Sequence, residues 1–262
     1  QFSKVCLSLA KLNPKVDTTK SLTASLAVIL AASDISIDEI AIYICCEAIM
    51  NLDCKSATTH AFVGAFASKL KKSSVYCHDG LLLQLMRCVR ELNNGFLDVT
   101  KALVLAISSK CSSSQLPSGY NDHPMGTNGI KTCISILQYL DGDSPFTHEL
   151  VSSLARKFRQ SRHGLLSDQL PIALGGLLIL DSCHPSTLDL HKCLAHLINL
   201  NPQPLTASQI ASMMKSLSAI DDSNVGTQDL ISALNTRVGM SINDVSFDDL
   251  QATCALNGLS SL

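Results

Sequence analysis

The sequence predicts an all-α fold, an α-solenoid of the armadillo or HEAT type, built from about six and a half helix-turn-helix units of about 40 residues. Three observations indicate this fold: an aliphatic ending that recurs before Asn or Asp, apolar residues at helical spacing before it, and a second apolar stripe after it. The anchors of the recurring ending are Leu12, Leu52, Leu92, Leu140, Leu180 and Ile220.

The spacing inside each unit predicts two helices. Apolar residues stand three, seven and ten positions before each anchor, which places them on one face of an α-helix, here named helix A. The Asn or Asp after the anchor suits a helix ending or a turn. Apolar residues ten, fourteen and eighteen positions past the anchor, such as Phe62, Phe66 and Leu70, predict a second helix, helix B.

The first four units follow one another in order. Helix A of the first unit is truncated and spans residues 1–12, and a turn at Asn13 and Pro14 leads to helix B over 18–32. In the second unit, helices span 36–52 and 56–70, and Ser36 with Glu39 predicts a capping box. The third pair spans 78–110, and the fourth spans 128–140 and 146–158.

The fifth unit has an unusual helix A. Pro171, Gly175 and Gly176 all weaken it, so we expect a late start or a kink there. A capped helix begins at Thr206, the last full pair ends at Gly239, and a half unit runs from residue 244 or 246 to the end. About thirteen helices and essentially no strand follow from this organisation.

We expect one solenoid domain over residues 1–262, because a helix pair buries its apolar face only by stacking on its neighbours. The chain opens within a helix A, so we expect it to be a segment of a longer array, with further repeats or a partner protein covering the open N-terminal end. One interruption of the spacing falls in residues 111–126, which are rich in Ser, Pro, Gly and Asn. This stretch predicts an inserted loop, tolerated on one edge of the solenoid or used for binding.

Composition agrees with buried helices. Apolar residues make up 46% of the chain, charged residues 16%, and Trp is absent, as expected of helices covered on two sides. No apolar run is long enough to span a membrane, so no membrane partner is expected. The eleven cysteines scatter through predicted helices, where a free thiol acts as a small apolar group. That pattern favours a reducing compartment, either cytosol or organelle matrix.

No motif indicates an enzyme. The sequence has no Gly-rich phosphate loop, no GxSxG elbow and no HExxH, so we expect no catalytic residues and no cofactor. The nearest group of metal-ligand types is Cys183, His184, His191, Cys193 and His196. On a helix His191 and Cys193 point to different faces, so a tetrahedral zinc site is not expected there.

Positive charge recurs near the end of helix B. Lys69, Lys157 and Arg237 stand seventeen residues after their anchors, and neighbouring cations enlarge two of these positions into clusters. The candidate nucleic-acid contacts are Lys69, Lys71, Lys72, Lys110, Arg156, Lys157, Arg159, Arg162 and Arg237. Cations near a helix C-terminus are favoured by the helix dipole, and a stripe of them also suits a phosphate backbone. The net charge of −2 limits the second interpretation to a local stripe.

Residues 164–182 and 205–238 resemble the helical repeats of the FAST-kinase-like and octotricopeptide/heptatricopeptide proteins. Those repeats combine Leu-Ser/Thr-x-x-Gln/Glu-Ile/Leu-Ala with an Ala/Ser-Leu-x-x-Leu ending. The resemblance implies work on organellar RNA: transcript stability, processing, editing or ribosome assembly.

Two hypotheses follow. The first is a non-enzymatic, RNA-associated protein of a mitochondrial or other organelle-matrix ribonucleoprotein, with a transcript or rRNA and other proteins of a large complex as partners. The alternative is a protein-binding scaffold of the armadillo or HEAT type that makes no direct RNA contact, and a cytoplasmic location stays open.

Overall fold

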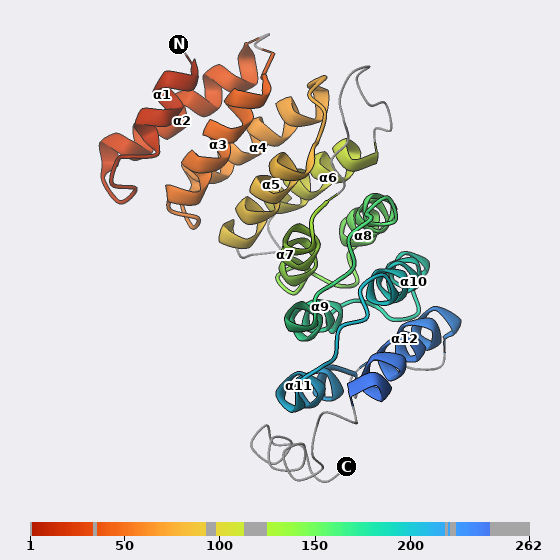
Figure 1. Ribbon diagram of the computed structural model, residues 1–262. Coiled ribbons are helices and arrows are strands. Elements are labelled where there is room, and N and C mark those ends of the chain that lie inside the picture. Colours follow the sequence, from red (N-terminus) through yellow and green to blue (C-terminus); the bar gives the residue numbers. More distant parts are fainter. Residues whose placement is uncertain are drawn as a thin grey trace. The chain divides into compact units, whose positions relative to one another are not determined.

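A computed structural model describes residues 2–33, 36–92, 98–112, 125–217, 220 and 224–241. This described part contains twelve α-helices, one short 3-10 helix and no strand, which confirms the all-α prediction (Figure 1). The half unit expected after residue 244 lies outside the described residues.

The helices alternate between the two predicted types. The A-type helices are α1 (Phe2–Leu9), α3 (Glu39–Asn51), α5 (Asp79–Leu92), α7 (Thr127–Leu137), α9 (Leu170–Leu177) and α11 (Ala207–Leu217). The B-type helices are α2 (Asp17–Ala32), α4 (Ala57–Lys72), α6 (Asp98–Ser112), α8 (Pro145–Phe158), α10 (Pro185–Asn199) and α12 (Val225–Ser241).

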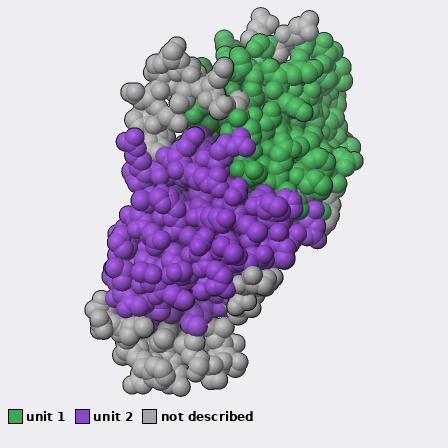
Figure 2. Space-filling model, turned by 90° about the vertical axis from the view of Figure 1, so that its right-hand side faces the viewer, with its two compact units in different colours: residues 1–123, 139–141, 145–153 green, residues 124–138, 142–144, 154–262 purple. Residues whose placement is uncertain are grey.

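Contacts divide the chain into two compact units (Figure 2). Unit 1 comprises residues 1–123, 139–141 and 145–153, and unit 2 comprises 124–138, 142–144 and 154–262. In unit 1, α1, α3 and α5 pack in order to form one layer, and α2, α4 and α6 form a second layer. In unit 2, α7, α9 and α11 pack in order, and α10 packs on α12. Neighbouring helices of each type therefore stack within a unit, whereas continuity of one array over residues 1–262 stays a prediction.

The predicted apolar stripes form the core. Phe62, Phe66 and Leu70 of α4 are all completely buried, and most equivalent positions of the other B-type helices are buried as well. Each repeat has an apolar residue three positions before its anchor. This residue is buried in five repeats and half-buried in the sixth, where it is Leu217. Apolar spacing therefore identified the correct faces of both helix types.

The sequence also predicts that the five anchors from Leu52 to Ile220 are buried between adjacent helix pairs, but they are less buried than that. Leu92, Leu140 and Leu180 are buried, but Leu52 and Ile220 are only half-buried, so that part of the prediction is wrong. The reason is that the A-type helices end at or before the anchor: α3, for example, ends at Asn51, and Leu52 follows as its cap. An anchor in the turn is covered on fewer sides than a residue one helical turn earlier.

The Asn or Asp after the anchor does act as a turn residue. The side-chain oxygens of Asn13, Asp53 and Asp181 each accept a hydrogen bond from the backbone N–H two residues later, at 3.0, 3.0 and 2.9 Å. These are Asx turns. They redirect the chain between helix A and helix B at equivalent places in three of the repeats.

Two predicted helix caps have different outcomes. The cap of α3 is Asp38, whose carboxylate accepts from the N–H of Ala41 at 2.7 Å, so the capping box from Ser36 is wrong by two residues. Before α11, Thr206 and Gln209 exchange side-chain to backbone hydrogen bonds in both directions. That reciprocal pair confirms the capped start at Thr206.

Helix A of the fifth unit begins late, as predicted. A 3-10 helix, η1 (Ser167–Gln169), precedes α9, and Pro171 lies in the first turn of α9, where a missing N–H does no harm. A methyl group on Gly176 would lie 2.2 Å from the backbone oxygen of Ile134, whereas one on Gly175 would meet nothing within 4 Å. Gly176 therefore allows α9 to approach α7 closely.

The predicted inserted loop starts later than expected. Cys111 and Ser112 still belong to α6, and residues 113–124 lie outside the described residues. At the other end, Met125 is buried and its backbone oxygen accepts a hydrogen bond of 2.9 Å from the hydroxyl of Ser161. Among the described helices, none combines the length and hydropathy of a membrane span.

Candidate nucleic-acid interface

Two lysines of the predicted basic stripe donate hydrogen bonds to backbone carbonyls of the preceding helix-turn-helix repeat. The ammonium of Lys69, in the last turn of α4, donates to the backbone oxygen of Ser33, which caps the C-terminus of α2. The ammonium of Lys110, near the end of α6, donates to the backbone oxygen of Ser73, which caps α4. In each case a cation satisfies a carbonyl that the end of a helix leaves without an intrahelical partner.

Arg237 makes the same connection in unit 2. It lies in α12 and is buried, with 1% of its surface exposed. One guanidinium nitrogen donates to the backbone oxygens of Ile198, at 3.0 Å, and Asn201, at the end of α10. The other donates to the hydroxyl of Ser167 at 2.9 Å. We name Lys69, Lys110 and Arg237 the inter-repeat clamps.

The clamps change the interpretation of the stripe. Burial lowers the pKa of both Lys110 and Arg237, and their nitrogens point at backbone oxygens inside the protein. Both side chains are buried and donate to oxygens inside the protein, so neither is kept in the candidate interface. The half-buried Lys69 also donates inward. Cations at a helix C-terminus were one of the two interpretations, but the helix that they serve is the preceding one and not their own.

The other candidate cations lie at the surface. Lys71 and Lys72 are exposed at the end of α4 in unit 1. In unit 2, Arg156, Arg159 and Arg162 are exposed and Lys157 is half-buried. These two sets belong to different units, and each forms its own patch.

The larger patch is the basic cluster, defined as Arg156, Lys157, Arg159, Arg162 and His163. It occupies the end of α8 and the segment after it. Phe158, between them in sequence, is completely buried and fixes this turn of α8 so that the cationic neighbours face outward. No acidic residue occurs in 156–163. The sequence RKFRQSRH therefore combines one core anchor with a surface that is entirely cationic or neutral.

An acidic residue of α10 contacts the cluster. The guanidinium of Arg159 lies 3.0 Å from the carboxylate of Asp189, and both side chains are 49% exposed. An ion pair this exposed contributes little to stability, so it does not prevent Arg159 from exchanging partners. The pair also shows that the cluster lies beside α10.

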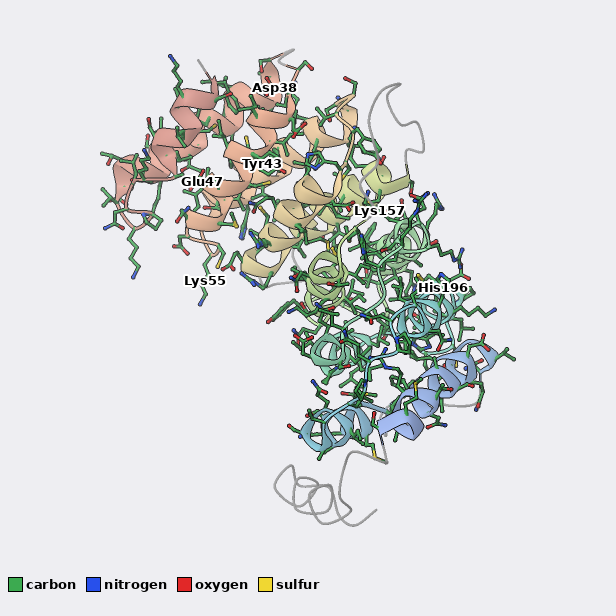
Figure 3. All side chains as sticks on the ribbon, in the orientation of Figure 1. Asp38, Tyr43, Glu47, Lys55, Lys157 and His196 are labelled. Carbon is green, nitrogen blue, oxygen red and sulfur yellow. The ribbon has the colours of Figure 1, made fainter. Side chains whose placement is uncertain are left out.

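Two further basic side chains on α10 were missed in the sequence. Lys192 and His196 are exposed on this helix, and Figure 3 shows His196 and Lys157 on the side of unit 2 away from α7 and α9. The signal for His196 was present, because it stands one 40-residue repeat after Arg156. Lys192 lies one helical turn earlier on the same face. Together with the basic cluster they form the α8–α10 basic surface.

The group of metal-ligand types is dispersed. The buried His191 shares a hydrogen bond of 3.0 Å with the hydroxyl of Thr227, and burial lowers its pKa to about 4. Burial raises the pKa of the Cys193 thiol to about 12. His184 accepts from the N–H of Ser186 and caps α10. Within the described ranges, no group of His, Cys, Asp and Glu is arranged to hold a metal ion.

Comparison with known proteins adds no relative. No family model, no curated protein and no solved structure matches this chain. The resemblance to the FAST-kinase-like and octotricopeptide/heptatricopeptide repeats therefore rests on the two quoted sequence stretches.

Proposed function

We propose that this chain is a non-enzymatic helical-repeat protein, an α-solenoid, that binds RNA through the α8–α10 basic surface. The RNA is a transcript or rRNA within an organellar, preferably mitochondrial, ribonucleoprotein. The single observation that carries the proposal is the acid-free run 156–163, in which Arg156, Arg159 and Arg162 are exposed. It stands out in a chain whose net charge is −2.

The residue types of the cluster suit phosphate. Three of its members are arginines, whose planar guanidinium groups donate two parallel hydrogen bonds to a phosphate. Lys157 and Lys192 contribute point charges. Contacts of this kind position a nucleic acid without specifying its sequence.

The stacking of helices supports an extended binding surface. The Arg159–Asp189 ion pair places the end of α8 beside α10. Arg156 of α8 and His196 of α10 occupy equivalent positions one repeat apart. A chain of phosphates that crosses α8 can therefore continue along α10. The contact is local, so we expect modest affinity and a small number of neutralised phosphates.

The experiment is a salt titration of binding to a single-stranded RNA of mixed sequence. Each phosphate contact contributes about 0.7 to the slope of log affinity against log salt concentration. Replacing Arg156, Lys157 and Arg159 together by Gln should lower the magnitude of that slope by about two. Affinity should fall for all RNA sequences alike, because phosphate contacts carry no base preference.

A matched control removes the same number of charges elsewhere. Lys4, Lys11 and Lys15 are exposed in unit 1, and their joint replacement by Gln should leave the slope unchanged. Replacing the clamp Lys110 by Met should reduce stability without altering the slope. An unchanged slope in the triple cluster variant, or absence of RNA affinity at low salt, contradicts the proposal.

A protein-binding scaffold is the second candidate, favoured by one specific observation. The first helix pair exposes several large apolar side chains, which are Val5, Leu7, Leu12, Val16, Val28 and Ile29. Exposed apolar patches mark protein interaction sites more often than nucleic-acid sites. In the titration, a folded chain without RNA affinity at low salt favours this candidate.

A further inference from the structure

An acidic residue lies among the cations of the α8–α10 basic surface. Asp189 is the only acidic residue in 156–163 or in α10, and its carboxylate lies 3.0 Å from the Nη2 atom of Arg159. Both side chains are 49% exposed, so the two charged groups meet at the surface and not in the core. A surface that binds phosphate through cations therefore presents one carboxylate to the same ligand.

The position of this carboxylate follows from its neighbours on α10. Asp189, Lys192 and His196 are spaced by three and four residues, which places them on one face of the helix. The buried Cys193 lies one turn after Asp189, and both members of the ion pair act on its thiol. Burial raises the pKa of Cys193 to about 12, while the Arg159 guanidinium lowers this pKa and the Asp189 carboxylate raises it. The ion pair therefore lies over α10, beside the exposed Lys192.

Stability does not explain an acidic residue at this position. Asp189 is the fifth residue of α10, which begins at Pro185, and the helix dipole favours acidic side chains mainly within the first turn. An ion pair between two half-exposed side chains contributes little. A carboxylate beside phosphate-binding cations also repels phosphate. A favourable contact between this carboxylate and the ligand itself would account for its place in the surface.

The 2′-hydroxyl of ribose is a ligand group that fits this carboxylate. Phosphate contacts are the same in RNA and DNA, so the cations of the surface do not distinguish the two, whereas the 2′-hydroxyl does. A carboxylate only accepts hydrogen bonds, and a hydroxyl donates a strong one to it. Acidic side chains hold the ribose of bound dinucleotides by the same contact.

The ion pair leaves hydrogen-bonding atoms for both groups of one nucleotide. The contact joins Nη2 of Arg159 to Oδ1 of Asp189. A guanidinium has further N–H donors along its other edge, and a carboxylate has several acceptor sites. In RNA the 2′-hydroxyl stands on the carbon next to the one that carries the 3′-phosphate. Arg159 can therefore hold a phosphate while Asp189 accepts from the hydroxyl beside it.

We propose that Asp189 lets the α8–α10 basic surface select RNA over DNA. Its carboxylate accepts a hydrogen bond from a ribose 2′-hydroxyl, while Arg159 binds the adjacent phosphate. This inference rests on the proposed function, because it adds recognition of the sugar to the phosphate contacts. In DNA the hydroxyl is absent, so the carboxylate meets the phosphates without a compensating hydrogen bond.

The test compares the binding of three single strands that share one base sequence, with uracil in each. They are RNA, DNA, and RNA with fluorine in place of every 2′-hydroxyl. Fluorine is similar in size to the hydroxyl but donates no hydrogen bond, so this strand isolates the donor. The wild type should bind RNA about three to ten times more tightly than either of the others, as expected for one hydrogen bond. In Asp189→Ala the three affinities should become equal.

Asp229→Ala is the matched control. Asp229 is exposed in α12 at the repeat position of Asp189, 40 residues later in the sequence and outside the α8–α10 basic surface. Its replacement removes the same charge and should leave the preference for RNA as in the wild type. Circular dichroism checks that each variant is folded. If Asp189→Ala does not fold, Asp189→Leu, which also lacks an acceptor, replaces it.

The outcomes separate this inference from the proposed function. Equal wild-type affinity for RNA and the fluorinated strand, or a preference for RNA that Asp189→Ala retains, overturns the role of Asp189. The salt slope of the wild type and of the triple cluster variant still decides RNA binding in that case. Absence of affinity for all three strands at low salt overturns the proposed function and this inference together.

Discussion

A guanidinium nitrogen of Arg237 in α12 donates a hydrogen bond of 3.0 Å to the backbone oxygen of Ile198 in the last turn of α10. The last carbonyls of a helix have no partner within it, and here the next B-type helix supplies one. Lys69 and Lys110 make corresponding bonds to Ser33 and Ser73 in unit 1. The inter-repeat clamps therefore explain, in terms of packing, why cations recur near the end of helix B.

Replacing Arg237 by Met should destabilise unit 2. Met keeps an unbranched side chain of similar length but removes the guanidinium donor, so the oxygens of Ile198 and Asn201 keep only their backbone hydrogen bonds from Asn201 and Gln203. Each lost hydrogen bond to the charged group should cost about 1.5 to 3 kcal/mol. Lys at this position should lose less, because Lys69 and Lys110 show that an ammonium can reach the equivalent carbonyl. Urea unfolding followed by circular dichroism measures the difference. The exposed Arg162, replaced by Gln, is the control and should change stability by less than about 0.5 kcal/mol.

The adjacent glycines of α9 should respond oppositely to Ala. Ala at Gly176 places a methyl group against the backbone of Ile134, and the resulting strain should destabilise the protein by about 1 to 3 kcal/mol. Ala at Gly175 meets open space and should stabilise the helix by up to about 1 kcal/mol. Unfolding midpoints of the two variants, measured side by side, test this. Equal effects of the two substitutions would mean that α9 and α7 are not in close contact at Gly176.

The buried His191 should make stability fall in mild acid. Its pKa is lowered to about 4 in the folded protein, whereas an unfolded histidine titrates near 6.5. The unfolded state therefore binds a proton first as the pH falls, so the stabilisation is fully present above about 6.5 and is lost progressively towards pH 4. The full loss is up to about 3 kcal/mol by this linkage.

Unfolding measurements between pH 7 and pH 4 test this expectation. A His191→Gln variant should have a lower stability at pH 7 and a weaker dependence on pH. The exposed His196 of the same helix is the matched control for the substitution itself, and its replacement by Gln should change stability at pH 7 by less than about 0.5 kcal/mol. A wild-type pH profile that is flat over this range contradicts the assignment.

Local spacing in the sequence was sufficient for the helices. The offsets of three, seven and ten before the anchors and of ten, fourteen and eighteen after them describe one face of a helix, and that face is buried in the structure. Helix ends were less accurate: α3 is capped by Asp38 and not by Ser36. A cap depends on which of several suitable side chains meets a backbone N–H, and apolar periodicity carries no information on that choice.

One repeated feature of the sequence became apparent only from burial. A threonine follows each anchor by seven residues, or by eight in the third unit, in the first turn of every B-type helix. The six are Thr19, Thr59, Thr100, Thr147, Thr187 and Thr227, and all are buried. Threonine is mostly exposed in folded proteins, so its burial could not be inferred from residue type.

The direction in which each cation points depends on contacts between neighbouring helix-turn-helix repeats. Lys69 and Lys71 lie two residues apart in α4 and have the same chemistry, yet one binds the end of the preceding helix and the other faces solvent. The carbonyl that Lys69 binds belongs to Ser33, far away along the chain. A cation near a helix end finds its partner according to where the neighbouring helix stops, and that position follows from the stacking of whole helices. Periodicity along the chain identifies which residues share a face, whereas packing in three dimensions determines what that face meets.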